Sequence, residues 1–115
     1  MPDFLPIGSI VLLDDTEKRY MITGTMQMSS RTGEIFDYIA VPYPEGHLGL
    51  ETERLFSFKE IREVVFTGYT DKEYEKYMET VLLLYKFRES DLFKKMKELS
   101  VRLEKMREAK EKQNL

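Results

Sequence analysis

The sequence predicts an α+β fold in which a small antiparallel curved sheet, or an SH3-like open barrel, is followed by one long C-terminal helix or a helical hairpin. Two observations support this prediction. Residues 8–68 contain short β-branched and aromatic segments separated by polar turns. Residues 70–115 contain no glycine or proline, and their apolar residues recur at helical spacing. We therefore expect an antiparallel β-domain in residues 1–69 and a helical region in residues 70–115.

The β-domain should begin with an antiparallel meander, because three strand-like segments are joined by short polar connections. These segments are SIVLL at 9–13, RYMITGTMQM at 19–28 and IFDYIAV at 35–41. A short fourth strand is expected within 54–58 and a fifth within 62–68. Gly24 stands in the middle of the second segment, which predicts the bulge that a strongly curved sheet needs.

The helical region should begin near residue 70. Thr70 and Glu73 have the spacing of a capping box. From Tyr74 to Tyr85 the apolar residues share one broad helical face, and VLLLYKF at 81–87 is apolar almost all round, so we expect this helix to contact two surfaces. Ser90 can act as the N-cap of a second helix. The alternative is one continuous helix through the same residues.

A narrow apolar stripe continues through the last part of the chain, with members that step by four and three residues over two to three heptads. The stripe consists of Leu92, Met96, Leu99, Leu103 and Met106. It can be buried by folding back on residues 74–85, or by pairing with another chain, either a second copy or a client protein. A small β-domain offers little area for two long helices, and methionine adapts to differently shaped partners. We therefore expect the stripe to be a partner-binding surface.

The stretch VPYPEGHLGL at 41–50 is the least ordinary part of the β-domain. Its candidate contact residues are Pro42, Tyr43, Pro44, Glu45, Gly46 and His47. Each proline favours an extended conformation in the residue before it, and the Pro-Glu-Gly order favours a type I turn that ends in glycine. The resulting stiff loop either contacts a partner or only crosses between two edges of the sheet.

Composition and motifs exclude several classes of protein. The chain has no cysteine, its net charge is −3, and neither half is basic enough for a nucleic-acid footprint. It contains no glycine-rich phosphate loop and no GxSxG nucleophile motif, and His47 has no converging set of metal ligands in the sequence. We expect no catalytic residue, cofactor or metal site. With no apolar run long enough to span a bilayer and no signal peptide, a cytoplasmic protein is expected.

Three stretches carry a resemblance to a known family. LPIGSIVLL at 5–13, YIAVPYPEGHLG at 38–49 and VVFTGYTDKEYEKY at 64–77 resemble domain of unknown function 4176, a small family of Gram-positive bacteria. The resemblance covers about residues 5–77. It implies that the gene lies beside type VII secretion genes, near LXG-type toxins and their small helical partners.

The resemblance implies an adaptor or chaperone that holds a toxin, or a small helical secretion protein, before export. The family supplies no catalytic residues to carry over, and the VPYPEG loop matches its motif. Two other classes remain open on the residues alone. One is an immunity-type protein that binds and blocks a toxin domain, and the other is a self-associating structural module, such as a homodimer.

Overall fold

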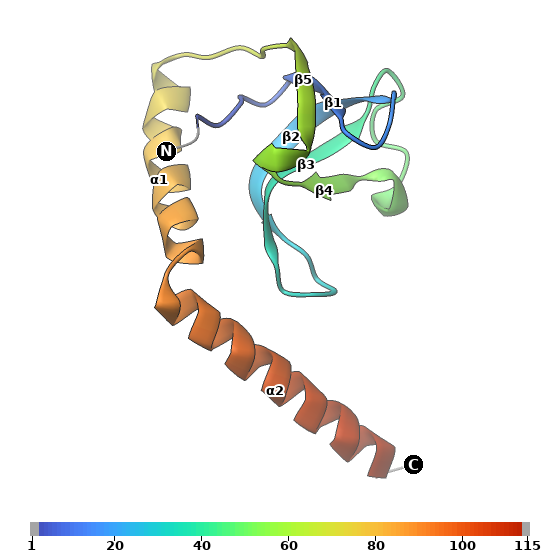
Figure 1. The fold of residues 1–115 in the computed structure, drawn as a ribbon, viewed down its shortest axis with the longest axis vertical. Helices are drawn as coiled ribbons and strands as arrows, with labels where there is room; N and C mark the ends of the chain where they lie inside the picture. Colours follow the sequence, from blue (N-terminus) through green and yellow to red (C-terminus); the bar gives the residue numbers. More distant parts are fainter. Residues whose placement is uncertain (1–2, 114–115) are drawn as a thin grey trace.

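The computed structural model describes residues 3–113 and places a curved five-stranded sheet beside two consecutive helices (Figure 1). The strands are β1 (Ile10–Leu13), β2 (Arg19–Met28), β3 (Ile35–Pro42), β4 (Arg54–Phe56) and β5 (Ile61–Phe66). Two short 3-10 turns are η1 (Leu50–Thr52) and η2 (Phe58–Glu60), and the helices are α1 (Lys72–Arg88) and α2 (Asp91–Gln113). The α+β arrangement expected from the sequence is confirmed.

The five strands form one antiparallel open sheet with the order β4-β3-β2-β1-β5. The first three strands make the predicted meander, and η2 joins the two strands that lie at opposite edges of the sheet. The sheet curls so far that β4 and β5 approach each other without forming a ladder (Figure 1). Both edges therefore stay unpaired in the described part of the chain.

Gly24 marks a break in register, as the sequence predicts. Ile22 pairs with Ala40, whereas Gly24 pairs with Ile39, so β2 contains one extra residue at this point. A methyl group at Gly24 would lie 2.9 Å from the Ile39 Cγ2 atom. A larger residue at this position would therefore force the Ile39 side chain to shift.

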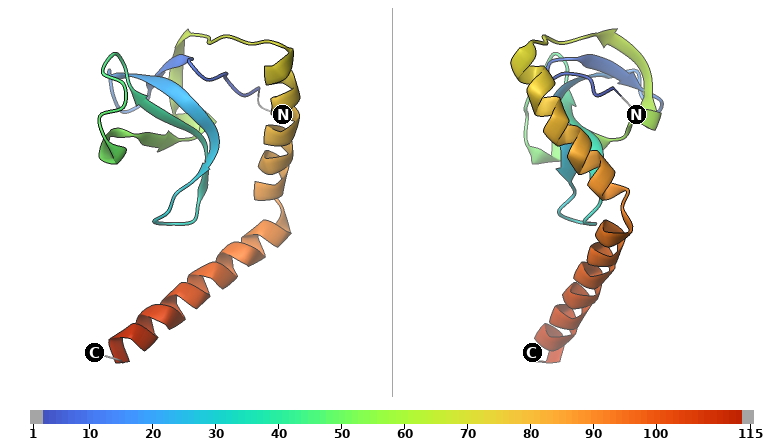
Figure 2. Two further views of the ribbon diagram at one scale, coloured as in Figure 1. Left: turned by 180° about the vertical axis from the view of Figure 1, so that it is seen from behind. Right: turned by 90° about the vertical axis from the view of Figure 1, so that its left-hand side faces the viewer.

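The hydrophobic core lies between the concave side of the sheet, the N-terminal arm and α1. Its fully buried members from the sheet are Val11, Leu13, Ile22, Tyr38, Ala40 and Phe56. Phe4 from the arm packs edge-to-face on Tyr38 and Phe58, with ring centroids 5.7 and 4.8 Å away. Val81 is the only fully buried residue of α1 in the described chain, and it joins this core. The helix thus covers the open side of the sheet (Figure 2).

The first helix begins one residue later than the predicted capping box requires. Asp71, not Thr70, is the N-cap residue, and its Oδ1 atom accepts a 2.9 Å hydrogen bond from the Tyr74 N–H. The two residues are adjacent and both carry a suitable oxygen, so sequence alone could not decide between them. The capping-box prediction is therefore wrong, whereas the start of a helix at this point is right.

The helical region breaks where Ser90 was expected to cap a second helix. The Ser90 Oγ atom accepts a hydrogen bond of 3.2 Å from the Phe93 N–H and donates one of 2.5 Å to the Phe87 carbonyl. After this bend α2 points away from α1 instead of returning along it (Figures 1 and 2). The molecule is consequently elongated, with extents of 52 × 30 × 24 Å.

Candidate functional site

The apolar stripe of α2 is open to solvent along its whole length. We call it the α2 stripe, and it consists of Leu92, Met96, Leu99, Leu103 and Met106. Each of these side chains is between 51 and 62 % exposed. The sequence predicted that these residues share one helix face, and the structure confirms that arrangement and leaves the face uncovered.

The side of α2 that approaches the β-domain is a different one. The Phe93 ring packs edge-to-face on Phe87 of α1, with centroids 5.5 Å apart, and the Lys97 Nζ atom lies 3.7 Å from the Glu34 Oε1 atom of the β2–β3 turn. Phe93 and Lys97 lie about 100–140° around the helix from the α2 stripe. The intramolecular contacts of α2 therefore leave the stripe free.

A buried ion pair sets the point from which α2 departs. The Asp37 side chain of β3 is 4 % exposed, and its Oδ1 atom lies 2.7 Å from the Nη1 atom of Arg88 at the end of α1. The Asp37 Oδ2 atom accepts a 2.9 Å hydrogen bond from the Phe58 N–H, and Arg88 Nη1 donates one of 3.1 Å to the Ile35 carbonyl. The Arg88 guanidinium also lies over the Tyr85 ring, 4.8 Å from its centroid. These contacts hold the end of α1 against β3.

The charge of Arg88 is maintained at this site. Burial by itself lowers the pKa of Arg88, but hydrogen bonding to Asp37 and Glu89 outweighs burial and raises the pKa above its usual value. The sequence analysis missed this pair. The available signal was the lone carboxylate in the third strand segment, Asp37, on a face otherwise formed by Ile35 and Ile39.

The loop at 42–47 lies at the end of the β-domain that is remote from the helices (Figure 1). Its turn differs from the type I turn favoured by the sequence. The Tyr43–Pro44 peptide bond is cis, and the Gly46 N–H donates a 2.7 Å hydrogen bond to the Pro42 carbonyl. The expected turn would place a hydrogen bond between the Gly46 N–H and the Tyr43 carbonyl, whereas here the bond to the Pro42 carbonyl closes a wider turn.

The polar side chains of this loop are tied to neighbouring segments. Glu45 Oε1 lies 2.6 Å from Lys18 Nζ, and His47 Nδ1 lies 3.0 Å from Glu53 Oε1. Tyr43 is 44 % exposed, and its N–H donates to the Arg19 carbonyl at 2.9 Å. The loop is thus well anchored and offers one exposed aromatic ring, but it lies far from the α2 stripe.

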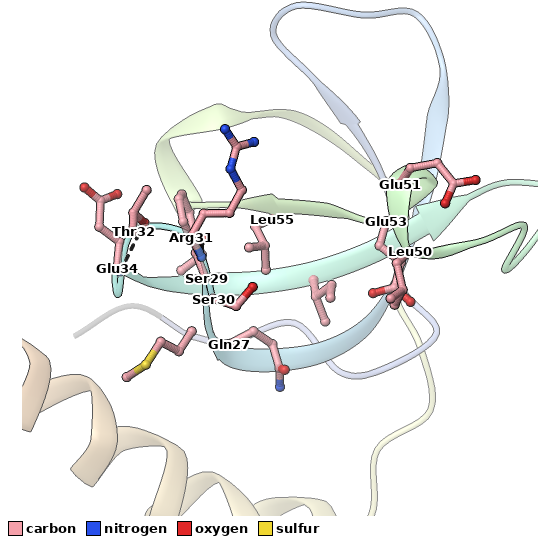
Figure 3. A pocket seen from close by; sticks show the side chains of 13 residues that line it. Gln27, Ser29, Ser30, Arg31, Thr32, Glu34, Leu50, Glu51, Glu53 and Leu55 are labelled. Carbon is pink, nitrogen blue, oxygen red and sulfur yellow. Dashed lines mark hydrogen bonds between the residues drawn. The ribbon is translucent and has the colours of Figure 1, made fainter. Parts of the chain in front are cut away.

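A groove of about 900 Å³ runs along the outer side of β3 and β4. Its apolar lining includes Phe36, Ile39 and Leu55. Its polar lining comes from the 29–34 turn and from Glu51 and Glu53 in and beside η1 (Figure 3). Among its lining residues no side chain is paired with a base in the manner of an activated nucleophile. The groove is a broad apolar surface with a mixed-charge rim.

A further exposed apolar surface, which the sequence analysis did not single out, lies on the edge strand β5. Val64, Val65 and Phe66 are 42 to 58 % exposed, and β5 pairs only with β1. Within residues 3–113, no group of three or more acidic or histidine side chains could hold a metal ion. No helix in the same range is both long and apolar enough to cross a membrane.

Comparison with known protein families places the chain. A family model described as Domain of unknown function (DUF4176) matches residues 4–77, which is more than half of the chain. The chain belongs to the DUF4176 family. The matched residues contain the N-terminal arm, the whole sheet, the 42–47 loop and the first part of α1.

The DUF4176 match ends at Tyr77 within α1, so the bend and the α2 stripe lie beyond the matched residues. No curated protein and no solved structure matches the chain. The family assignment therefore describes the β-domain, and any role of the α2 stripe depends on its own exposure and chemistry.

Proposed function

We propose that this DUF4176 protein is a non-enzymatic adaptor or chaperone that binds a helix of a protein partner along the α2 stripe. The main support for this proposal is the exposure of the stripe. Five apolar side chains at heptad spacing are each more than half exposed, while α2 touches the rest of the chain through Phe93 and Lys97 on another side. A narrow apolar seam at this spacing fits the seam of a second helix.

The size of the stripe favours reversible binding. Full burial of a leucine or methionine side chain contributes about 1.5–3 kcal/mol, and these side chains are already about half buried. Covering all five therefore contributes roughly 5 kcal/mol, from which the cost of association must be subtracted. Such a surface suits a chaperone that must later release its client better than an inhibitor that must hold a toxin permanently.

We propose a partner from the type VII secretion pathway, either an LXG-type toxin or a small helical secretion protein, met in the cytoplasm before export. The support for this choice is the resemblance of residues 5–77 to a family whose genes are implied to lie in such loci. The exposed Tyr43 ring in the anchored 42–47 loop is a second, independent contact in this proposal.

A matched pair of substitutions tests the proposal. Leu99→Asp places a carboxylate in the middle of the stripe, and Val101→Asp makes the same change on the opposite side of α2, where Val101 is 42 % exposed. The tagged wild-type protein and the Val101→Asp variant should capture the same toxin or helical secretion protein from native cells, and Leu99→Asp should lose it. Equal capture by all three proteins would refute a role for the stripe.

Co-expression with the captured toxin separates the chaperone from the immunity-type alternative. A chaperone raises the amount of soluble or exported toxin and leaves its toxicity intact, whereas an immunity-type protein protects the host cell. Sedimentation of the protein alone tests the self-associating module, because a dimer that the Leu99→Asp variant cannot form would identify a second copy as the occupant of the stripe.

A further inference from the structure

The α2 stripe has a rim of one charge sign. Lys95 and Arg102 lie along one side of the stripe, and Arg107 lies along the other side. Lys110 lies in line with the stripe, beyond Met106. All four are exposed and lie within about 80° of the stripe axis. Every acidic residue of α2 lies about 100° or more from that axis, toward the opposite face. The apolar seam is therefore bordered only by cationic and uncharged side chains.

The rim charges have few partners inside the molecule. Arg107 pairs with Glu104 at 2.5 Å, between side chains that are 66 % and 53 % exposed. An exposed pair of this kind is weak and is readily exchanged for another carboxylate. For Lys95 and Arg102, no salt bridge to another described residue is present. The rim is thus available to carboxylates on a partner.

Pairing of two copies through the stripe would bring these cations together. In heptad notation Lys95 and Arg102 occupy g positions, and Arg107 occupies an e position. A parallel pair sets g against e of the other helix, and an antiparallel pair sets g against g and e against e. Because no acidic residue occupies either set of positions, both arrangements place basic or neutral groups opposite each other. The rim therefore opposes self-association.

An anionic membrane would also attract a cationic rim, but the rest of α2 does not suit a membrane surface. The stripe spans only about 80° of the helix circumference, which is the width of a coiled-coil seam, whereas membrane-surface helices present a broader apolar face. Phe93, the only aromatic residue of α2, is turned into the bend against Phe87. Four glutamates on the polar side of α2 offset part of its positive charge and so weaken its attraction to an anionic surface.

We propose that the occupant of the α2 stripe is an amphipathic helix whose own apolar seam is bordered by acidic residues. This inference deepens the proposed function and rests on it. The apolar seam of α2 provides the contact area, and the cationic rim selects acidic partners and rejects basic ones. The rim also excludes a second copy of α2, so the surface stays open until the acidic helix arrives.

The test uses the full chain and two synthetic helical peptides of three heptads with identical leucine seams. One peptide has glutamate at every e and g position, and the other has lysine at those positions, so each repels itself and stays monomeric. Binding of each labelled peptide is measured by fluorescence anisotropy at low and high salt. Anionic lipid vesicles form a third arm, and sedimentation of the protein alone forms a fourth.

Two charge-reversed variants make the test specific for the rim. The rim variant carries Lys95→Glu, Arg102→Glu and Arg107→Glu. The control variant carries Lys94→Glu, Lys105→Glu and Lys112→Glu, which gives the same net charge but places the changes on the opposite face of α2. Three exposed charge pairs correspond to roughly a tenfold change in affinity.

The acidic peptide should bind the wild-type and control proteins roughly tenfold more tightly than the basic peptide, and the difference should shrink in high salt. The rim variant should reverse this preference. If both peptides bind equally and Leu99→Asp abolishes both, the stripe is a helix-docking site and only the charge inference is overturned. If neither peptide binds, both proposals are overturned. Binding to vesicles in place of peptides, or a dimer of the protein alone, would also overturn the acidic-helix inference.

Discussion

The ion pair between Asp37 and Arg88 should be the main electrostatic contribution to stability in this molecule. Arg88→Ala removes the cation that lies 2.7 Å from a carboxylate with only 4 % of its side chain exposed. It also removes the hydrogen bond to the Ile35 carbonyl and the contact with the Tyr85 ring. The Phe58 N–H then remains as the hydrogen-bond donor to Asp37.

The expected loss follows from these contacts. Removal of one partner of a buried pair costs about 3–5 kcal/mol. Arg88 is 16 % exposed and Asp37 keeps one donor, so we expect the free energy of unfolding to fall by about 2–4 kcal/mol. Arg62→Ala is the matched control, because it breaks a 3.1 Å pair with Glu17 whose side chains are 43 % and 86 % exposed. That change should cost far less stability than Arg88→Ala, because water screens an exposed pair.

Urea unfolding followed by far-ultraviolet circular dichroism measures both losses. Asp37→Asn, alone and combined with Arg88→Ala, completes a double-mutant cycle and should give a coupling energy of at least about 1 kcal/mol. Strict additivity of the two substitutions, or equal losses for Arg88→Ala and Arg62→Ala, would refute the assignment of this pair as the anchor of α1.

Three further predictions concern the core, the stripe and the buried tyrosine. Val81→Ala should lower the free energy of unfolding by about 2–3 kcal/mol, because the side chain is fully buried between α1 and the sheet; a loss below about 0.5 kcal/mol in the urea assay would show that α1 does not complete the core. Leu99→Asp should change the free energy of unfolding by less than about 1 kcal/mol and keep the helical signal in circular dichroism, because the Leu99 side chain is 53 % exposed. If the substitution unfolds the whole protein instead, the stripe belongs to the core of the monomer. Burial is the largest effect on the Tyr38 phenol and raises its pKa above the usual value near 10. The protonated phenol therefore stabilises the folded protein fully below about pH 10, and this contribution is lost as the pH rises further. The free energy of unfolding should fall more steeply with rising alkaline pH in the wild-type protein than in the Tyr38→Phe variant. If it falls equally in both proteins, the buried Tyr38 phenol is not the cause of the loss.

Local patterns predicted most of the elements of the fold. Alternation in 19–28 and 35–41 indicates β2 and β3, Gly24 marks the bulge between them, and Ser90 caps α2. These predictions succeed because strand pleat, bulge chemistry and helix capping depend on residues a few positions apart. The helix cap at Asp71 and the turn at Pro44 were missed, because neighbouring residues offered competing choices that the path of the chain decides.

The residues of the candidate site likewise include some that local patterns predict and some that only contacts between distant segments bring together. Heptad spacing is a local property, so the sequence alone identifies all five residues of the α2 stripe. Asp37 and Arg88 were missed because they are 51 positions apart in sequence and meet only when α1 packs across the sheet. The exposed edge of β5 was missed for a similar reason, because strand order decides which strand lies at an edge.

The sequence by itself determined that this protein has a β-domain followed by helices and that the last helical segment carries a narrow apolar seam. Only the tertiary structure decided that the seam stays uncovered. Its exposure depends on the direction in which α2 leaves the bend, and that direction follows from the Ser90 cap, the Phe87–Phe93 contact and the anchoring of Arg88 on β3. Contacts between distant segments form only in the folded chain, so no local pattern could specify which face of α2 would remain open.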